Sequence, residues 1–336
     1  MTRICTIILL LIAPLCQAAK TRIVVDPSGK GDFRTIQQAL QSLPDSAAED
    51  RLIFIKNGFY REQLSIRKNH ITLQGESKTG TVISGSISHL IYTCQHPGDK
   101  NSAVMNIDGN DITLRDLTVE NTYGHDAADS VFIDCTNAQT GKPEKTKVVK
   151  TAHQFTLKTG TATRLKVINC IVRSYGQDTV SPWSGTGMYY FKDCTLIGGT
   201  DFYCPRGWAY AENCTFIVNV PGAIAIWHDG SKGRDIKSVF RNCYFKGEQH
   251  FQLGRYHHEA SFYLIDCHFD KNMMDKPIYK AETAKPMVWE STVYYSNAHT
   301  DGPKFNWLKD NLYQAPGAPK AGDINAAWTF NRKWNP

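Results

Sequence analysis

Two aspartates placed one sequence repeat apart are the residues of this chain best suited to catalysis. Asp178 and Asp201 are 23 residues apart (201 − 178 = 23). Two carboxylates held close together repel each other, so we expect the pKa of one to be raised and that of the other to be held down. Such a pair supplies an acid and a base, or an acid and a nucleophile, at neutral pH.

The repeat is marked by Asn or Asp followed directly by Cys. This tag occurs at residues 169–170, 193–194, 213–214, 242–243 and 266–267, so that its cysteines are 24, 20, 29 and 24 residues apart. Short apolar or alternating runs, typical of strands, flank the tags. Short strands at this period predict a solenoid, in which equivalent residues of successive coils lie about 4.8 Å apart. Asp178 and Asp201 should then be neighbours on one wall.

Further polar residues fall at the phase of the aspartates when they are counted back from each tag. They are Gln154, Gln177, the pair Trp227 and His228, and Arg255. The two glutamines offer neutral N–H donors that suit an oxyanion. Arg255 is expected to reach Asp201 across two coils, a backbone gap of about 9.6 Å. Spacing alone leaves a glycosidase, an esterase, a non-catalytic binder and ordinary solvated turns open.

The remaining segments are expected to complete and close the solenoid. Residues 35–43 predict a short amphipathic helix that caps the first coil, whose strand edges would otherwise be exposed. Residues 125–150 break the repeat, and their polar and basic second half, residues 141–147, is interpreted as an excursion from the stack and not as a strand. We expect a solvated loop there, with a lip over a groove as the alternative. Beyond residue 270 the repeat fades, and we expect the tail to pack along the solenoid and cover its far end.

Composition and the N-terminus point to an exported protein. Residues 1–18 have the form of a secretory signal peptide; their apolar run is too short to span a bilayer, and a lipoprotein anchored at Cys16 is the lesser alternative. We therefore expect a periplasmic or extracellular location. The formal charge of +6 suits a polyanionic partner. The sequence carries no nucleic-acid motif, so an acidic polysaccharide is favoured over nucleic acid.

Eight of the ten cysteines follow the expected signal peptide. Five of them share one phase of the repeat, where Cys usually packs as a small buried side chain. We therefore favour stacked free thiols over a disulfide framework, although export permits disulfides. No C-x-x-C pair occurs in the sequence, which argues against a zinc site.

Short segments distributed along the chain carry a family resemblance. The chain resembles pectin methylesterases, a family of right-handed parallel β-helix enzymes that remove methyl groups from esterified polygalacturonate. The resemblance covers nearly the whole mature chain. Its segments are residues 32–39, the Gly-Phe-Tyr-Arg-Glu of 58–62, His153-Gln154, Gln177-Asp178-Thr179-Val180, Asp201-Phe202 and Leu253-Gly254-Arg255.

The resemblance implies a role for each residue of the constellation. Asp201 would be the nucleophile, and Asp178 the general acid for departing methanol and then the general base for water. Gln177 would donate to the oxyanion with assistance from Gln154, and Arg255 would orient Asp201 and keep it ionised. The resemblance implies no metal or organic cofactor. It also implies methyl-esterified polygalacturonate and water as partners of a monomeric, single catalytic domain spanning residues 22–336.

Departures from the family pattern lie around this constellation and put the substrate surface in question. Tyr256 and His257 replace the Pro-Trp that follows the family's Arg, and Tyr203 begins another altered stretch. Trp183 and Trp227 could replace the lost Trp as platforms for a sugar. The candidate substrate-binding residues are Trp183, Tyr203, Trp227, His228, Tyr256 and His257. An esterase for a different uronate ester or a thioester, and a non-catalytic pectin-binding solenoid, remain alternatives. A polygalacturonase is disfavoured because its Asn-Thr-Asp and Gly-His-Gly signatures are absent, and a lyase because no acidic cluster suggests a calcium site.

Overall fold

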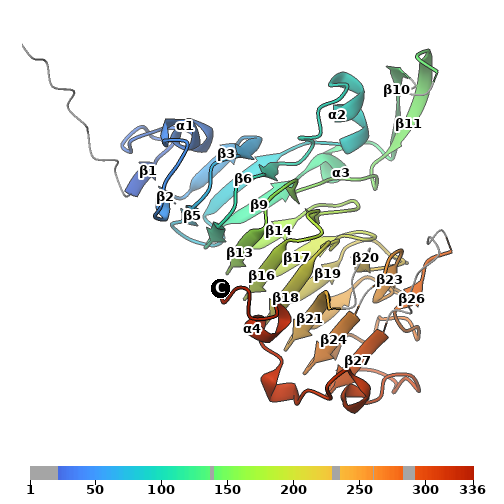
Figure 1. The fold of residues 1–336 in the computed structure, drawn as a ribbon. Coiled ribbons are helices and arrows are strands. Elements are labelled where there is room, and N and C mark those ends of the chain that lie inside the picture. The colour runs from blue at the N-terminus through green and yellow to red at the C-terminus, as the bar shows by residue number, and fades with distance from the viewer. Residues whose placement is uncertain (1–21, 137–139, 229–234, 260, 283–291) are drawn as a thin grey trace, which may run out of the picture.

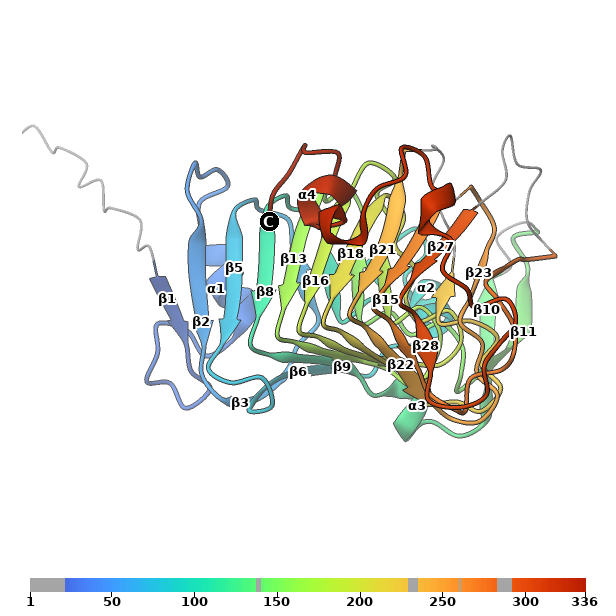
Figure 2. The same cartoon turned by 90° about the horizontal axis from the view of Figure 1, so that it is seen from below.

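A computed structural model describes residues 22–136, 140–228, 235–259, 261–282 and 292–336. The expected signal peptide lies outside these ranges. Short strands wind into a parallel β-helix with three faces (Figures 1 and 2). This confirms the expected all-β solenoid.

Two long parallel sheets form two of the faces. The first contains, in spatial order, β1 (Arg22–Val25), β2 (Arg51–Ile55), β5 (Ile71–Gly75), β8 (Ile112–Arg115), β13 (Arg164–Ile168), β16 (Met188–Lys192), β18 (Trp208–Glu212), β21 (Lys237–Arg241), β24 (Ser261–Ile265) and β27 (Thr292–Ser296). The second contains β28 (His299–Thr300), β25 (His268–Phe269), β22 (Tyr244–Gly247), β19 (Thr215–Val218), β17 (Thr195–Gly198), β14 (Ile171–Arg173), β9 (Thr118–Asn121), β6 (Thr81–Gly85) and β3 (Gly58–Arg61).

The third face is made of two shorter parallel sheets joined by a bridge. One contains β15 (Val180–Pro182), β12 (Leu157–Thr159), β7 (Met105–Ile107) and β4 (Leu64–Ile66), and the other β20 (Trp227–His228), β23 (Gly254–Tyr256) and β26 (Tyr279–Lys280). Tyr203 links them, because it bridges Val180 and its N–H donates to the Ile226 carbonyl at 3.1 Å.

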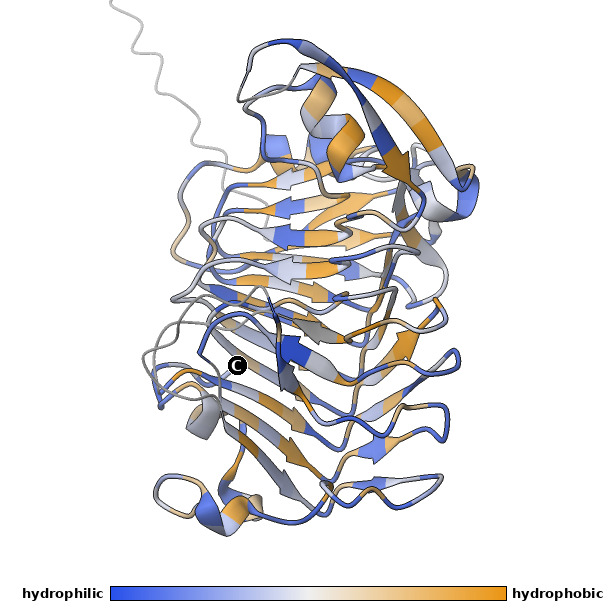
Figure 3. Cartoon of the chain, turned by 90° about the vertical axis from the view of Figure 1, so that its right-hand side faces the viewer, coloured by the Kyte–Doolittle hydropathy of each residue, from blue (hydrophilic) through white to orange (hydrophobic). Residues whose placement is uncertain are grey.

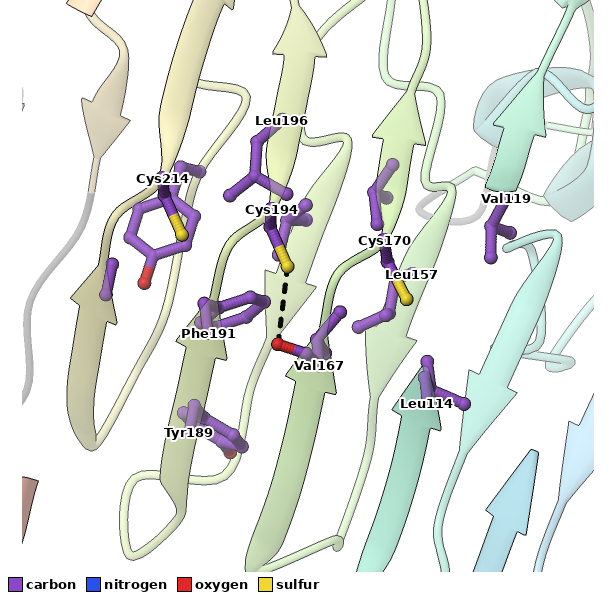
Figure 4. Close-up of a cluster of buried hydrophobic side chains, with 14 of the residues drawn as sticks. Leu114, Val119, Leu157, Val167, Cys170, Tyr189, Phe191, Cys194, Leu196 and Cys214 are labelled. Carbon is purple, nitrogen blue, oxygen red and sulfur yellow. Dashed lines mark hydrogen bonds between the residues drawn. The ribbon is translucent and has the colours of Figure 1, made fainter. Parts of the chain in front are cut away.

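The core consists of ladders of apolar side chains at one register position of successive coils. Figure 3 shows hydrophobic and hydrophilic residues alternating along single strands, the pattern that turns alternate side chains inward. One ladder of the first sheet is fully buried along the helix, and Figure 4 shows its central part. Its members are Ile53, Leu73, Leu114, Val167, Phe191, Ala211, Phe240 and Leu264.

The Asn/Asp-Cys tag is explained by the corner between the first two sheets. Its Asn or Asp has a φ of 50 to 55° at all five positions, a left-handed conformation that these residue types tolerate better than others. Their side chains also bond from coil to coil; Asn242 Nδ2, for example, donates to Asn213 Oδ1 at 2.8 Å. The next residue, Cys, turns into the core as a buried free thiol (Figure 4). The expected thiol ladder is confirmed.

Both ends of the solenoid are covered as expected. Helix α1 (Ile36–Ser42) begins after Thr35, whose hydroxyl accepts from the Gln38 N–H at 3.2 Å, and it buries Ile36, Ala39 and Leu40 against the first coils. At the other end the tail carries η1 (Leu312–Gln314), η2 (Ala321–Asp323) and α4 (Ala326–Thr329). Figures 1 and 2 place α4 alongside β18 and β21, where Phe330 packs in a second apolar cluster.

A projecting arm departs from the sequence interpretation of residues 125–150. After the short α3 (Tyr123–Asp126), residues 130–149 leave the stack as expected, but they form two paired antiparallel strands, β10 (Ser130–Thr136) and β11 (Pro143–Val149). A disulfide between Cys94 and Cys135 joins β10 to helix α2 (His89–Gln95). The prediction that residues 141–147 form no strand was therefore wrong, since most of them belong to β11, and two of the eight cysteines form a disulfide.

Candidate active site

The candidate residues gather at the start of the strands of the third face. His153 bridges Gln177 in parallel register, and the Asp178 N–H donates to the Asp201 carbonyl at 3.3 Å. The Asp201 N–H in turn donates to the Ala225 carbonyl at 2.7 Å. Asp178 and Asp201 thus lie in adjacent coils, as their spacing predicts.

Both aspartates have a left-handed backbone conformation, with φ of 60° at Asp178 and 56° at Asp201. Few residue types other than Gly, Asn and Asp adopt this conformation readily. At these two positions the backbone therefore favours Asp for conformational reasons as well as for its carboxylate. Asn is the substitution that preserves the backbone best.

Asp201 is held by Arg255, which projects from β23. Arg255 Nε donates to Asp201 Oδ1 at 3.1 Å, and Arg255 Nη2 donates to Asp201 Oδ2. Asp201 is only 4% exposed, and burial raises its pKa, while the two hydrogen bonds from Arg255 oppose that rise. The fork holds both carboxylate oxygens and favours their ionised form.

Asp178 lies beside Asp201 in a different environment. Burial raises its pKa from the ordinary value near 3.8 to about 6. His153 Nε2 lies 3.4 Å from Oδ2, and the Cys204 thiol donates to Oδ1 at 3.1 Å. A carboxyl group with this pKa can give up and take back a proton near neutral pH.

The expected contrast in pKa between the two aspartates takes a different form. Burial raises the pKa of both, and not of one alone. The two aspartates differ in their partners. Arg255 donates to both carboxylate oxygens of Asp201, whereas no guanidinium among the described residues donates to the carboxylate oxygens of Asp178. The site therefore still contains one carboxylate favoured as an anion and one poised to exchange a proton.

The two glutamines differ in what they can offer. The Gln177 side chain is partly exposed beside Asp178, and its amide makes no hydrogen bond within the described residues. Gln154 is 0% exposed; its Nε2 donates to the carbonyls of Lys150 and Ala152, and its Oε1 accepts from the Gly124 N–H at 3.1 Å. Both N–H groups of Gln154 are thus engaged, which corrects the expectation that it assists at the oxyanion.

His153 occupies the position that we expected Gln154 to fill. It pairs with Gln177 on the neighbouring coil and points its half-exposed ring toward Asp178. Because successive side chains of an extended segment face opposite ways, only one of residues 153 and 154 can project outward. The sequence alone left open whether His153 or Gln154 projects outward. The pairing with Gln177 turns His153 outward and buries Gln154.

The candidate substrate-binding residues fall into three groups. Tyr203 is 1% exposed and packs in the core against Phe191 and Phe216, so the expectation that it contacts substrate was wrong. Tyr256 is half-buried against the core, while His257 lies close enough to Asp201 to favour its anion. Trp227 and His228 form β20 beside β23, but their side chains lie outside the described part of the chain.

Trp183 lies in a basic part of the same face. Lys158 Nζ and the Arg206 guanidinium lie 4.3 and 4.8 Å from its ring centroid, and Phe155 packs edge-on against it. A cavity of about 350 Å³ adjoins the ring and is lined also by Lys100 and Lys158. Sequence reasoning did not identify these cations, which stand on separate coils.

Two further observations concern metal binding and membrane-spanning helices. Within the described ranges, no group of three or more His, Cys, Asp or Glu side chains is arranged to hold a metal ion. No helix among the described residues is long and apolar enough to cross a membrane.

The chain is similar to known proteins both in sequence and in fold. The pectinesterase family model matches residues 22–161. "Probable pectinesterase/pectinesterase inhibitor 58" of Arabidopsis thaliana is 26% identical over 308 residues, which are 85% of this chain and 47% of that protein. A "Pectinesterase" of Petunia integrifolia is 29% identical over 205 residues, 60% of this chain and 46% of that protein. The chain thus spans about half the length of these two relatives.

The fold is shared with solved structures. The pectin methylesterase of Erwinia chrysanthemi superimposes with a TM-score of 0.69 at 20% identity, over 94% of this chain and 97% of that one. This likeness confirms the parallel β-helix.

Proposed function

Since this chain is a divergent member of the pectinesterase family, we propose that it is a carboxylic ester hydrolase that removes methyl esters from pectin. The products are methanol and the free uronate of the polysaccharide. The observation that carries this proposal is the pairing of a buried, Arg-held carboxylate with a second carboxyl group of raised pKa one coil away.

In the first half of the reaction Asp201 attacks. One carboxylate oxygen forms a bond to the ester carbonyl carbon, and the negative charge that develops on the carbonyl oxygen is stabilised by the Gln177 N–H. The bond from that carbon to the methoxy oxygen then breaks. Asp178, which starts protonated, gives its proton to the departing methoxy oxygen, so that methanol leaves and an acyl-enzyme anhydride on Asp201 remains.

In the second half Asp178 acts as a base. Its carboxylate takes a proton from water while the water oxygen bonds to the acyl carbon. The bond between that carbon and Asp201 breaks, which releases the uronic acid and restores the Asp201 carboxylate and the protonated Asp178. The uronic acid then ionises to the uronate and gives its proton to the solvent. Atoms and charge balance over the cycle with ester and water as the only inputs.

Arg255 and Gln154 support these steps without touching the ester. Arg255 keeps Asp201 ionised and fixes the oxygen that attacks. Gln154 fastens the segment before β12 to Gly124, and so holds the coil on which His153 lies. We assign it a positioning role.

The surface beside the two aspartates suits an acidic polymer. Lys158 and Arg206 gather around Trp183 on the same face, and Arg206 is close enough to Asp178 to favour its anion. Free carboxylates of a partly demethylated chain would be attracted to these cations. We further propose that the chain acts after export, outside the cytoplasm, and as a monomer.

The decisive assay measures two products from highly methylated polygalacturonate. We expect methanol to be released in step with new carboxylate groups, without new reducing ends and without unsaturated product. Reducing ends or unsaturation would indicate chain cleavage instead. Faster hydrolysis of a different uronate ester or a thioester would move the substrate to another ester, and tight pectin binding without methanol would make the chain a binder.

A further inference from the structure

The proposed reaction leaves unused the imidazole of His153, which lies beside Asp178. Its Nε2 lies 3.4 Å from Asp178 Oδ2, and its side chain is 51% exposed beside the site. Its backbone pairs with Gln177, the residue just before Asp178. Contacts through both the backbone and the side chain therefore place the imidazole beside the Asp178 carboxyl group.

The orientation of the His153 ring is fixed from behind. It stacks on Phe155 with a centroid distance of 6.2 Å, and the ring of His89 meets it edge-on at 6.2 Å. The backbone N–H of His89 donates to the backbone carbonyl of His153 at 3.0 Å, which ties the first residue of α2 to this coil. His153 is therefore held in place although one side of its ring is open to solvent.

We propose that His153 is a positioning residue for Asp178, whose imidazole N–H orients the carboxyl group and stabilises the carboxylate that forms when Asp178 gives up its proton. The inference rests on the proposed function for its role in turnover. His153 keeps its own protons throughout the cycle, and the proton moves only between Asp178, the leaving methoxy oxygen and water. The residue acts on the ester through Asp178.

Several other charged or polar groups also face the Asp178 carboxyl group. Asp201 lies on the next coil, where its charge disfavours a second anion at Asp178, and Arg206 favours one. Cys204 donates to the opposite oxygen, and Arg255 is engaged with Asp201. His153 is the strongest of the cationic influences on the Asp178 carboxylate, while on Asp201 it follows Arg255 and His257.

His89 does not take over this role. Burial lowers its pKa to about 4, so its ring is neutral at the pH at which Asp178 exchanges a proton. Its Nδ1 is also within hydrogen-bonding distance of the Ser102 hydroxyl, at 2.7 Å. The neutral ring of His89 supports His153 through packing alone.

The pairing is tested by a titration that needs no substrate. The side-chain carboxyl carbon signal of Asp178 is followed by NMR against pH in the full chain and in His153→Gln. A positive charge close to a carboxyl group favours the carboxylate. We therefore expect the midpoint of Asp178 to rise in the variant. Superimposable curves would overturn the proposal whatever the enzyme hydrolyses.

The role in turnover is tested by pH–rate profiles of two variants. His153→Gln keeps an N–H donor without charge, whereas His153→Phe removes both. Loss of the charge raises the pKa of Asp178, which then holds its proton to higher pH, so the alkaline limb should move up in both variants. We expect kcat to fall on the order of tenfold more in His153→Phe than in His153→Gln, with KM little changed in either.

A matched control is His299→Gln, an exposed histidine on the last strand of the second face. It should leave both limbs in place. An unmoved alkaline limb together with a raised KM in the His153 variants would show a substrate contact and contradict the proposal. If His153→Phe does not fold, the alkaline limb of the His153→Gln profile alone tests the proposal, and it should still move to higher pH. If no ester is hydrolysed, the proposed function fails, and the NMR titration still decides whether His153 and Asp178 are paired.

Discussion

Arg255 donates to both carboxylate oxygens of Asp201 from a strand 54 residues further along the chain. The two residues are brought together because each coil of the solenoid returns to the same face. Their side chains therefore meet across coils on that face. Burial of Asp201 alone would favour its neutral form. The fork therefore decides whether the nucleophile is available.

Removing this fork should shift the acidic limb of the pH–rate profile. Without Arg255 the pKa of Asp201 rises further, so the carboxylate is lost at a higher pH as the solution is acidified. In Arg255→Ala we expect the limb to move to higher pH, with lower kcat. Arg255→Lys should recover part of the shift but not the orientation, since it keeps the charge without the fork.

Arg164→Ala is the control for this experiment. Arg164 makes the same two-pronged contact with Asp111 across coils, at a distance of 53 residues in sequence. It lies in β13 of the first sheet, not on the third face that carries the two aspartates. It should leave the limb in place. An acidic limb that does not move in Arg255→Ala would refute the role assigned to the fork.

Asp178 should make the native protein less stable as the pH rises. Its pKa is about 6 in the folded protein and near 3.8 when exposed, so the folded state holds a proton that the unfolded state releases between these values. The stabilisation is complete below pH 3.8 and is lost as the pH passes 6. The difference of about 2 units corresponds to at most about 3 kcal/mol.

Asp178→Asn tests this linkage and the acid role together. At pH 7 the variant should resist denaturant better than wild type, while at pH 3.5 the two should be alike. Its turnover should fall on the order of 100-fold or more, because a general acid contributes that much. A variant less stable than wild type at pH 7 would show that the carboxylate is well solvated in the native state.

The two glutamines should separate cleanly in mutagenesis. Gln177→Ala removes a free amide, so we expect kcat to fall by about 10²- to 10³-fold with unchanged stability. Gln154→Ala removes three buried hydrogen bonds and should cost about 1–3 kcal/mol of unfolding free energy. Thermal melts and kcat measured on both variants provide the comparison. The reverse pattern would restore Gln154 as the oxyanion donor.

The sequence predicted the parts of the fold that repeat. The Asn/Asp-Cys tag marks a corner where two constraints coincide, a left-handed residue and a small buried one, so its period gave the coil length and placed Asp178 beside Asp201. The cap helix was equally readable, since Ile36, Ala39 and Leu40 lie on one face.

The features that sequence reasoning missed depend on register and on distant pairing. Insertions between tags blur the phase by a residue or two, which suffices to exchange His153 for Gln154 and to turn Tyr203 from the groove into the core. Residues 140–147 are mostly polar, as suits the largely exposed strand β11. The sequence there therefore lacks the alternation of apolar and polar residues that marks a half-buried strand. The bond from Cys94 to Cys135 joins elements that no repeat relates.

The cysteines provide a test of the fold without activity. The chain lacking residues 1–18 contains eight, of which six are buried free thiols and two are bonded. We expect almost no reaction with a thiol reagent in native conditions, six thiols in denaturant and eight after reduction. Eight thiols in denaturant without reductant would show that the link between α2 and β10 does not form.

The proposed reaction depends on attack of the Asp201 carboxylate on a methyl ester. This step is tested by the rate of methanol release from highly methylated polygalacturonate by wild type and by Asp201→Asn, an isosteric variant that tolerates the same left-handed backbone. Circular dichroism should first show that both are folded alike. We expect rapid methanol release by wild type and a loss on the order of a thousandfold or more in the variant. Methanol release by Asp201→Asn at the wild-type rate would contradict the assignment of Asp201 as the nucleophile.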